Sequence, residues 1–284
     1  MTSYIENGYL KIGVKSFGSV LTSVKSVKSG YEFLWQGNPD VWNGQSPILF
    51  PVIGKMLDDK YSLNGKEYPM IRHGLARHYD FSLIDKSESS LTFEQVQNEE
   101  TLKSYPYNYS LKVRFELNKN SLTVTHTVKN TNDGVMYFSL GAHPAFNCKI
   151  GDRVVFEKNE TLYSERIDAD SVITGEKDLI LDGSKEIVLE AHTFDKDALI
   201  FENPKSDKVT LESENSDRKI VFTLGDAPFF AVWSKPNAPF VCLEPWHGIN
   251  DSYDKKADIS EKRGIEKLNP NEEFSFSWTA EFFE

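Results

Sequence analysis

Alternating apolar and polar residues recur through most of the chain, and this pattern predicts an almost entirely β protein. The alternation is clear in residues 10–14 and 111–117, and again near the C-terminus in residues 274–279. A period of two is typical of strands that bury one face. Other short runs predict further strands at residues 122–128, 135–140, 153–156, 186–189, 199–201, 209–211, 220–224, 230–233 and 240–243.

Two hairpins are expected from the turn residues between neighbouring strands. Asn64-Gly65 lies between residues 61–63 and residues 67–68. Asn-Gly is a strong signal for a two-residue hairpin turn. Residues 118–120 form the expected turn of a second hairpin, between two of the strands named above.

Helical signals are confined to residues 99–105, which precede Pro106, and to residues 259–267. The chain has no internal repeat, low-complexity tract or linker-like stretch. Its 284 residues allow one large β domain or two ordinary ones, and a hydrophobic fraction of 39% is ample for a sizeable core. Many short strands separated by turns predict a β-sandwich.

The acidic composition excludes some classes of partner. The net charge is −11 and the pI is about 5.1, whereas proteins that grip nucleic acid carry a basic stripe. The N-terminus has no basic patch followed by an apolar stretch, so no signal peptide is expected. No apolar run approaches membrane-spanning length. We therefore expect a cytoplasmic protein without a nucleic-acid or membrane partner.

Two cysteines, Cys148 and Cys242, fit reduced thiols in that compartment. Without a histidine cluster at ligand spacing, they are poor evidence for zinc, and no metal is expected.

A histidine with a restricted backbone follows the strand expected at residues 135–140. The stretch reads Leu-Gly-Ala-His-Pro-Ala-Phe-Asn and ends at Asn147. Pro144 fixes its own φ and favours an extended backbone at His143. Because the unperturbed pKa of histidine is about 6.5, this side chain could donate or accept a proton near neutrality. For a lone histidine, a core side chain satisfied by a backbone carbonyl is the more common explanation.

A second unusual stretch begins about a hundred residues later. Residues 240–243 are apolar, and they are followed by Glu244, Pro245 and Trp246. A carboxylate at the end of a buried strand is costly unless it is paired or used. The structural alternative is a salt-bridged or hydrogen-bonded glutamate. The two cysteines flank these two motifs, which suggests that the motifs are neighbours in space.

A local cluster of cations stands out in the acidic chain. Arg72, His73, Arg77 and His78 lie within seven residues, and Lys55 precedes them. One explanation is a surface loop whose arginines pair with the many carboxylates. The other is a site for a polar substrate.

Together these motifs resemble the aldose 1-epimerase (galactose mutarotase) family, in its shorter branch of mutarotase-like proteins. The His-Pro-x-Phe-Asn and Leu-Glu-Pro-Trp elements carry the resemblance, with Arg-His-Gly at residues 72–74 as a weaker third, and the blocks occur in the family's order over residues 4–282. The resemblance implies one domain over residues 1–284, an antiparallel β-supersandwich with the sugar site on a concave face. It also implies a small-molecule sugar as substrate, with no cofactor, and we expect a monomer or weak homodimer.

The family's reaction opens the pyranose ring and closes it on the other face of C1. A base takes the C1 hydroxyl proton while an acid protonates the ring oxygen. By resemblance, Glu244 is the base and His143 the acid. The expected substrate-binding residues are Arg72, His73, Arg77, Asn147, Trp246, Lys55 and Asp197. Asp197 rests on position alone, and Lys55 stands where relatives often carry arginine.

Other functions remain open at this point. Some proteins of this branch resemble hexose-6-phosphate mutarotases, and the arginines of residues 72–77 could meet a phosphate. A glycoside hydrolase or lyase would need two flanking carboxylates, of which Glu244 is the clear candidate. A non-catalytic sugar-binding module need not keep both His143 and Glu244. His126, on an apolar strand face, is expected to be structural, and His247 could be a rim residue.

Overall fold

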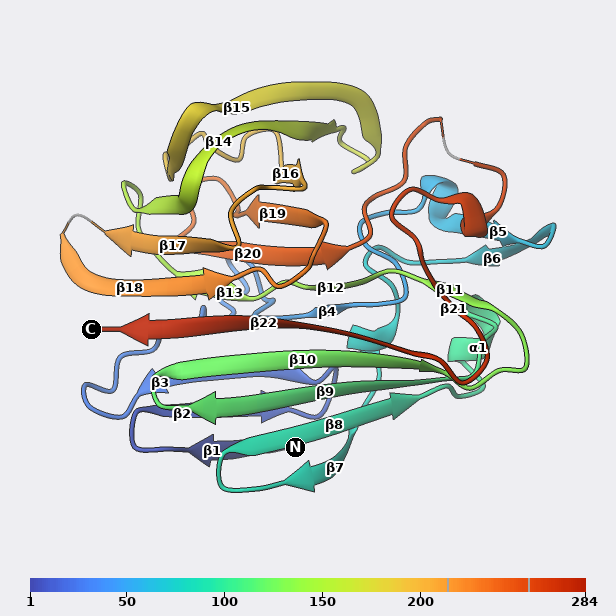
Figure 1. Ribbon diagram of the computed structural model, residues 1–284, viewed down its shortest axis with the longest axis horizontal. Helices are drawn as coiled ribbons and strands as arrows, with labels where there is room; N and C mark the ends of the chain where they lie inside the picture. Colours follow the sequence, from blue (N-terminus) through green and yellow to red (C-terminus); the bar gives the residue numbers. More distant parts are fainter. Residues whose placement is uncertain (214, 255) are drawn as a thin grey trace.

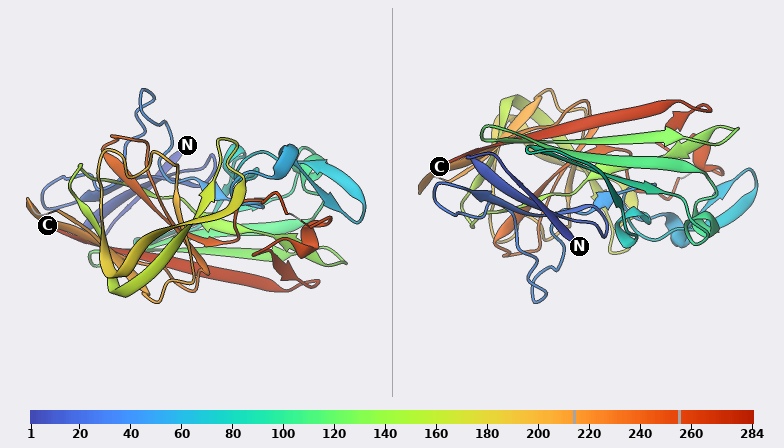
Figure 2. Two further views of the ribbon diagram at one scale, coloured as in Figure 1. Left: turned by 90° about the horizontal axis from the view of Figure 1, so that it is seen from above. Right: turned by 90° about the horizontal axis from the view of Figure 1, so that it is seen from below.

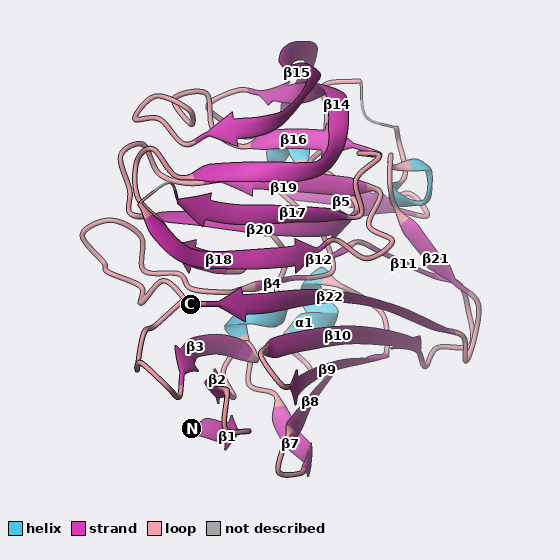
Figure 3. Ribbon diagram, turned by 60° about the vertical axis from the view of Figure 1, so that its left-hand side comes forward, coloured by secondary structure: helices cyan, strands magenta, loops and turns pink. Residues whose placement is uncertain are grey.

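The computed structural model of the chain is almost entirely β, as the alternating pattern predicts (Figure 1). It describes residues 1–213, 215–254 and 256–284. Most strands in these residues belong to one antiparallel sheet of 15 strands, which Figure 3 shows stacked from β15 to β7. This architecture confirms the all-β class and the large antiparallel sheet.

The order of strands in the large sheet runs from β4 to β7. Its strands are β4 (Ile48–Leu49), β12 (Leu140–Ala142), β20 (Phe240–His247), β19 (Phe229–Trp233), β16 (Leu199–Glu202), β14 (Arg153–Ile167), β17 (Lys208–Ser213), β18 (Ser216–Thr223), β22 (Glu273–Phe283), β10 (Ser121–Asn130), β9 (Tyr109–Asn118), β8 (Ser90–Val96) and β7 (Ser82–Lys86). Off this path, β13 (Ala145–Asn147) pairs with β20, and β15 (Ile173–Val188) pairs with β14.

Smaller sheets and short helical turns complete the described residues. The small sheets are β1 (Thr2–Glu6), β2 (Leu10–Lys15) and β3 (Val20–Ser26); β5 (Lys60–Leu63) and β6 (Lys66–Pro69); and β11 (Met136–Phe138) and β21 (Glu266–Leu268). The helical elements are α1 (Thr101–Ser104) and the 3₁₀ turns η1 (Leu57–Asp59), η2 (Ala76–His78) and η3 (Ile259–Glu261). Within the described residues, no helix has the length and apolar character that crossing a membrane requires.

Both predicted hairpins are present. Asn64 and Gly65 join β5 to β6 with positive φ values of 51° and 77°. Two consecutive positive φ values are what a type I′ turn needs, and Asn-Gly adopts them readily. The second hairpin turns between β9 and β10 through Lys119 and Asn120.

The strand β10 shows how alternation builds the core. Leu122, Val124 and His126 face inward, and the imidazole of His126 lies flat on Phe276, with ring centroids 4.9 Å apart. The structure thus confirms that His126 belongs to the core. The outward residues form cross-strand hydroxyl pairs with β22, for example between Thr125 and Ser277 at 2.8 Å.

The three-stranded sheet packs against the β7 to β10 half of the large sheet, which Figure 2 shows from above and below. Ile5 and Ile12 from this sheet join Leu91 and Phe115 from the large sheet in one hydrophobic core. Burial of such apolar faces on each side is what holds the two layers together.

Three local predictions need correction. Residues 259–267 are not a helix: η3 ends at Glu261, and Gly264 has a φ of +70°, which breaks a right-handed helix before β21 begins. Residues 135–140 form two strands, because the Ser139 N–H leaves the ladder and donates to the carbonyl of Pro51.

The third correction concerns residues 153–189, where two short strands were expected. The structure has a long hairpin instead, with 15 residues in β14 and 16 in β15. Much of this hairpin is polar and exposed, so hydrophobic alternation does not reveal it. Its tip, residues 168–172, reaches the site described next.

Candidate active site

The floor of the site is one face of β20. Alternate residues of this strand, Cys242, Glu244 and Trp246, share a face, because side chains alternate along a strand. Leu243, on the other face, joins the main core. All of these side chains are buried, and Glu244 is only 1% exposed.

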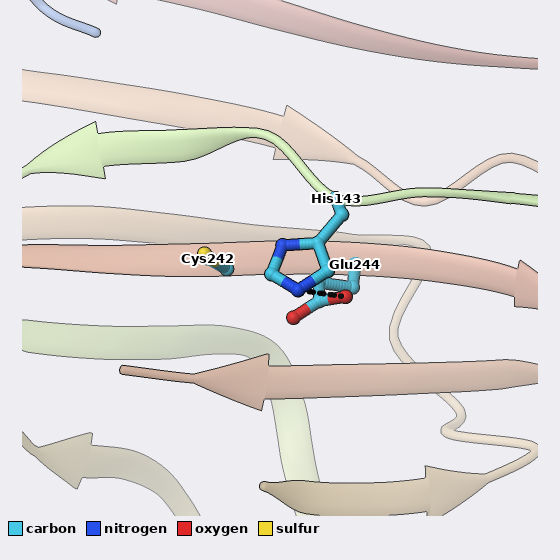
Figure 4. Close-up of side chains that lie close together, drawn as sticks. All are labelled: His143, Cys242 and Glu244. Carbon is cyan, nitrogen blue, oxygen red and sulfur yellow. Dashed lines mark ion pairs between the residues drawn. The ribbon is translucent and has the colours of Figure 1, made fainter. Parts of the chain in front are cut away.

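His143 reaches this floor from the adjacent strands. Gly141 pairs with Trp246 and Ala145 pairs with Cys242, so the register places His143 opposite Glu244. Pro144 has no N–H to continue the ladder, and the chain turns outward between β12 and β13. Figure 4 shows the imidazole over β20, with its Nε2 atom 3.4 Å from Oε2 of Glu244.

Aromatic rings enclose the imidazole of His143. Trp42 stacks on it with ring centroids 5.3 Å apart and planes 23° apart. Trp233 meets it edge-on at 5.4 Å, and His73 does so at 5.8 Å. These rings exclude water from one side of His143 and leave it 7% exposed.

The close approach of Trp246 depends on the absence of a side chain at Gly141. A Cβ atom there would lie 2.7 Å from Cδ1 of Trp246, which is closer than real Cβ contacts come. The glycine therefore lets the indole lie against β12 beside Glu244. This packing leaves Trp246 only 3% exposed.

Burial shifts the pKa values of the two reactive groups in opposite directions. It lowers the pKa of His143, with a smaller contribution from the charge of Arg77. It raises the pKa of Glu244 well above its usual range, opposed in part by the nearby Trp246 indole and assisted by the charge of Asp197. The 3.4 Å separation would suit an ion pair, but a low-dielectric site disfavours both charges. The directions of both shifts therefore favour the neutral imidazole and the neutral carboxyl group.

Several polar atoms of the site are buried without a hydrogen-bond partner. In the part of the chain that the structure describes, Nδ1 of His143, Oε2 of Glu244 and Nε1 of Trp246 are buried and make no hydrogen bond of good geometry. Buried polar groups are normally satisfied. Three unsatisfied atoms in one place are typical of a site that binds a polar ligand.

His73 is held in a fixed tautomer by the neighbouring loop. Its backbone has a φ of 62°, and its Nδ1 atom accepts a hydrogen bond of 3.2 Å from the Gly54 N–H. Burial lowers the pKa of His73 well below its usual range, and the neighbouring His143 adds to this effect. A neutral imidazole that accepts at Nδ1 carries its proton on Nε2. His73 is therefore a hydrogen-bond donor at Nε2.

These side chains line a cavity of about 710 Å³. Its walls include the tip of the β14–β15 hairpin, the loop around Asp197 and the strand end at Trp233. Asp197 has a φ of 73°, and its carboxylate accepts from the N–H of Ala198. The structure thus brings Asp197 into the same cavity as Glu244.

Arg72 and Arg77 lie on the cavity wall, and both guanidinium groups donate hydrogen bonds to other protein groups. Arg72 donates from Nη2 to Oγ of Ser171 at 2.6 Å, and Arg77 donates to the carbonyl of Arg72 at 2.8 Å. Among the described residues, neither guanidinium pairs with a carboxylate. Burial and the adjacent charge of Arg72 lower the pKa of Arg77.

Two of the expected substrate-binding residues lie apart from the cavity. The Lys55 ammonium pairs with Asp170 at 3.6 Å and with Asp59 at 3.8 Å. The side-chain amide of Asn147 donates to the carbonyls of Glu32 and Leu34, so it ties neighbouring strands together.

A sequence model of the aldose 1-epimerase family matches residues 2–260, which include every residue of this cavity. The chain belongs to the aldose 1-epimerase family.

Related proteins agree with this assignment. The chain is 34% identical over 287 residues to the plasmid-encoded protein LacX of Lactococcus lactis subsp. lactis, and the match covers 95% of each chain. A galactose mutarotase related enzyme from Lactobacillus acidophilus has a similar structure, with a TM-score of 0.96, 32% identity and coverage of 100% of this chain and 98% of that one. A galactose mutarotase-like protein from Lactobacillus casei ATCC 334 gives a TM-score of 0.95 and 34% identity, with both chains fully covered.

Within this aldose 1-epimerase fold, the cavity also contains residues that the sequence did not reveal. Trp42 and Trp233 enclose His143, although nothing in the sequence distinguishes them from tryptophans of the core. The hairpin tip contributes Asp168 and Ser171. No local motif marks these four residues, because each reaches the site through the tertiary fold.

Cys242, expected from the sequence to be a reduced thiol, lies beside the two proposed reactive groups. Its sulfur, a ring nitrogen of His143 and a carboxyl oxygen of Glu244 all lie within 4.8 Å of one another (Figure 4). Burial is the main cause that raises the pKa of the thiol well above its usual range.

Proposed function

We propose that the protein interconverts the α and β anomers of a free aldohexose, such as galactose or glucose, by acid/base ring opening. One observation carries the proposal: the imidazole of His143 and the carboxyl group of Glu244 lie 3.4 Å apart, buried at the floor of a polar cavity. Ring opening needs one acid and one base at the same time. A pair with one proton supplies both.

The two side chains together carry the same number of protons before and after ring opening. Glu244 takes the proton of the C1 hydroxyl, and the bond from C1 to the ring oxygen breaks as the C1 carbonyl forms. His143 gives a proton to the ring oxygen. Rotation about the bond from C1 to C2 exposes the other face, and the reverse transfers close the ring.

This assignment requires the shared proton to start on His143. In the free protein, the directions of the pKa shifts place it on Glu244. A transfer over 3.4 Å, when the C1 hydroxyl binds at the carboxyl group, delivers the charged pair that the reaction needs.

Other cavity residues position the sugar. The Nε2–H of His73 donates to the ring oxygen or to a neighbouring hydroxyl. Arg72, Arg77 and Asp197 bind hydroxyl groups, and Trp246 packs against the ring. Because Lys55 and Asn147 lie apart from the cavity, they have no direct contact in this proposal.

Polarimetry on freshly dissolved α-D-galactose and α-D-glucose tests the proposal. The protein should accelerate the approach to anomeric equilibrium for at least one of the two sugars. If calorimetry shows that a sugar binds without any acceleration, the chain is a non-catalytic carbohydrate-binding protein instead.

A hexose 6-phosphate is the second candidate substrate, and the unpaired arginines favour it. Two guanidinium groups without carboxylate partners could receive a phosphate, which arginine binds in a forked geometry. Against this, Arg72 already donates to Ser171 and Arg77 to the carbonyl of Arg72. The other charged residues of the cavity wall are of mixed sign, namely Asp168, Asp195, Asp197, Arg166, Lys196 and Lys235. We therefore prefer the neutral sugar.

A further inference from the structure

The cluster of Cys242, His143 and Glu244 contains a soft, a borderline and a hard donor atom. The thiol and the carboxyl group lie two residues apart on one face of β20, and the imidazole faces them from the β12–β13 turn (Figure 4). Catalysis of ring opening uses the imidazole and the carboxyl group. It leaves the thiol without a role.

The spacing of these atoms is close to that of a tetrahedral zinc site. Zinc bonds of about 2.0–2.1 Å to nitrogen or oxygen and about 2.3 Å to sulfur imply ligand separations of roughly 3.4–3.6 Å. Nε2 of His143 and Oε2 of Glu244 are already 3.4 Å apart. All three donor atoms lie within 4.8 Å of one another, so the sulfur has to move closer to complete a tetrahedral site.

A second observation points to a ligand at this place. Oε2 of Glu244 is buried without a hydrogen-bond partner among the described residues, and it faces the other two donors. The 710 Å³ cavity provides room for a fourth ligand from water or a sugar hydroxyl.

We propose that His143, Cys242 and Glu244 bind a thiophilic divalent cation such as Zn²⁺, and that the bound ion blocks the acid/base pair. The binding step stands by itself, whereas the blocking step rests on the proposed function. Imidazole and thiolate select Zn²⁺ over hard cations such as Mg²⁺, which prefer oxygen ligands. The ion binds the lone pairs of His143 and Glu244 that would otherwise accept protons during the reaction.

Binding releases the thiol proton, because the sulfur–metal bond forms as the S–H bond breaks and the proton passes to solvent. Any proton that Glu244 carries also leaves, because its carboxylate donates a lone pair to the ion. Calorimetry in buffers of different ionisation enthalpy counts these protons.

Cobalt absorption and zinc calorimetry test the binding step on the intact protein. Co²⁺ should give a thiolate charge-transfer band in the near ultraviolet and visible bands of tetrahedral coordination. Cys242→Ser should remove the thiolate band and weaken Zn²⁺ binding by at least about tenfold. Cys148→Ala is the matched control, because that buried thiol lies outside the cluster, and it should leave both signals unchanged. Circular dichroism checks that each variant is folded, and Cys242→Ala serves if the serine variant is not.

Polarimetry with and without ZnCl₂ tests the blocking step. Zn²⁺ should abolish anomer exchange in the wild-type protein and in Cys148→Ala, whereas the rate of Cys242→Ser with zinc should stay close to that variant's own rate without zinc. MgCl₂ should have no effect. A cobalt spectrum without a thiolate band, or equal zinc sensitivity in Cys242→Ser, would overturn the site. Zinc bound at these ligands with full activity would overturn the blocking step. If the metal-free protein shows no anomer exchange, the proposed function fails, and the site is then judged on cobalt absorption and calorimetry alone.

Discussion

The indole of Trp42 lies nearly parallel to the imidazole of His143, with ring centroids 5.3 Å apart. This contact covers one face of the proposed acid and helps to keep it dry. Because desolvation disfavours the charged imidazolium, it is the main cause of the lowered pKa of His143.

The pH profile of wild-type anomer exchange should therefore be a broad plateau. The active pair holds one proton. Activity falls at low pH when His143 takes a second proton, and burial moves this limb to lower pH. Activity falls at high pH when the shared proton is lost, and the raised pKa of Glu244 moves that limb to higher pH.

Trp42→Ala should narrow this plateau from the acid side. Water reaching the exposed imidazole raises the pKa of His143 towards its reference value of about 6.5, so the acid limb moves up by about one pH unit or more. Trp42→Phe keeps an apolar cover and should change the limb much less. The profile of kcat against pH measures both, and an unshifted acid limb in Trp42→Ala would contradict the proposed cause.

Removing either member of the catalytic pair should nearly abolish turnover. A positioned acid or base contributes about 10²–10⁴-fold, so Glu244→Gln and His143→Ala should each lose activity on that scale. The double variant should be little worse than either single variant, because the two groups act as a unit. Polarimetry measures the rates and circular dichroism checks the fold. Near wild-type turnover in a folded variant would remove that residue from the mechanism.

The charge of the substrate can be decided by comparing sugars with their 6-phosphates. We expect kcat/KM for galactose or glucose to equal or exceed that for the phosphorylated sugar, measured by anomer-exchange NMR. A charge-assisted hydrogen bond contributes about 1.5–3 kcal/mol, so a true phosphate site would favour the phosphorylated sugar by roughly ten- to over a hundredfold. A phosphate preference of that size, lost in Arg77→Ala, would replace the neutral sugar and leave the epimerase chemistry intact.

His126 should make the fold less stable in mild acid. Burial lowers the pKa of His126 to about 3, whereas the unfolded side chain titrates near 6.5. Between these values the unfolded state binds more protons, so stability falls as the pH falls through 6.5 and this loss levels off below 3. From pH 7 to pH 5, the loss from this one residue is about 2 kcal/mol.

His126→Leu tests that prediction, since leucine keeps an apolar side chain against Phe276. The free energy of unfolding, from urea titrations at pH 7 and pH 5, should drop by about 2 kcal/mol more in the wild type than in the variant. Equal drops in both proteins would show that His126 titrates normally in the fold.

Local chemistry explains which features the sequence revealed. Asn64-Gly65 was predicted correctly because few residue pairs tolerate the two positive φ values of that turn. The opposition of His143 and Glu244 followed from motifs at strand ends, although only the register of β12 and β13 on β20 gives their distance.

The missed features depend on long-range pairing. The strand β15 consists largely of exposed polar residues, and its pairing with β14 rather than a run of apolar residues defines it, although both strands bury residues such as Leu162 and Leu181 in the core. Trp42 meets His143 across about a hundred residues of chain, and no local pattern encodes that contact. The expectation of one domain over residues 1–284 stays a prediction.

The β14–β15 hairpin has a consequence for how this family can diversify. The proposed acid and base lie on β20 and in the turn between β12 and β13, where burial restricts substitution. The hairpin tip at residues 168–172 meets the cavity wall through Ser171, which accepts a hydrogen bond from Arg72. Substitutions in the tip should therefore change which sugar fits the proposed site while they leave the proposed acid/base pair in place.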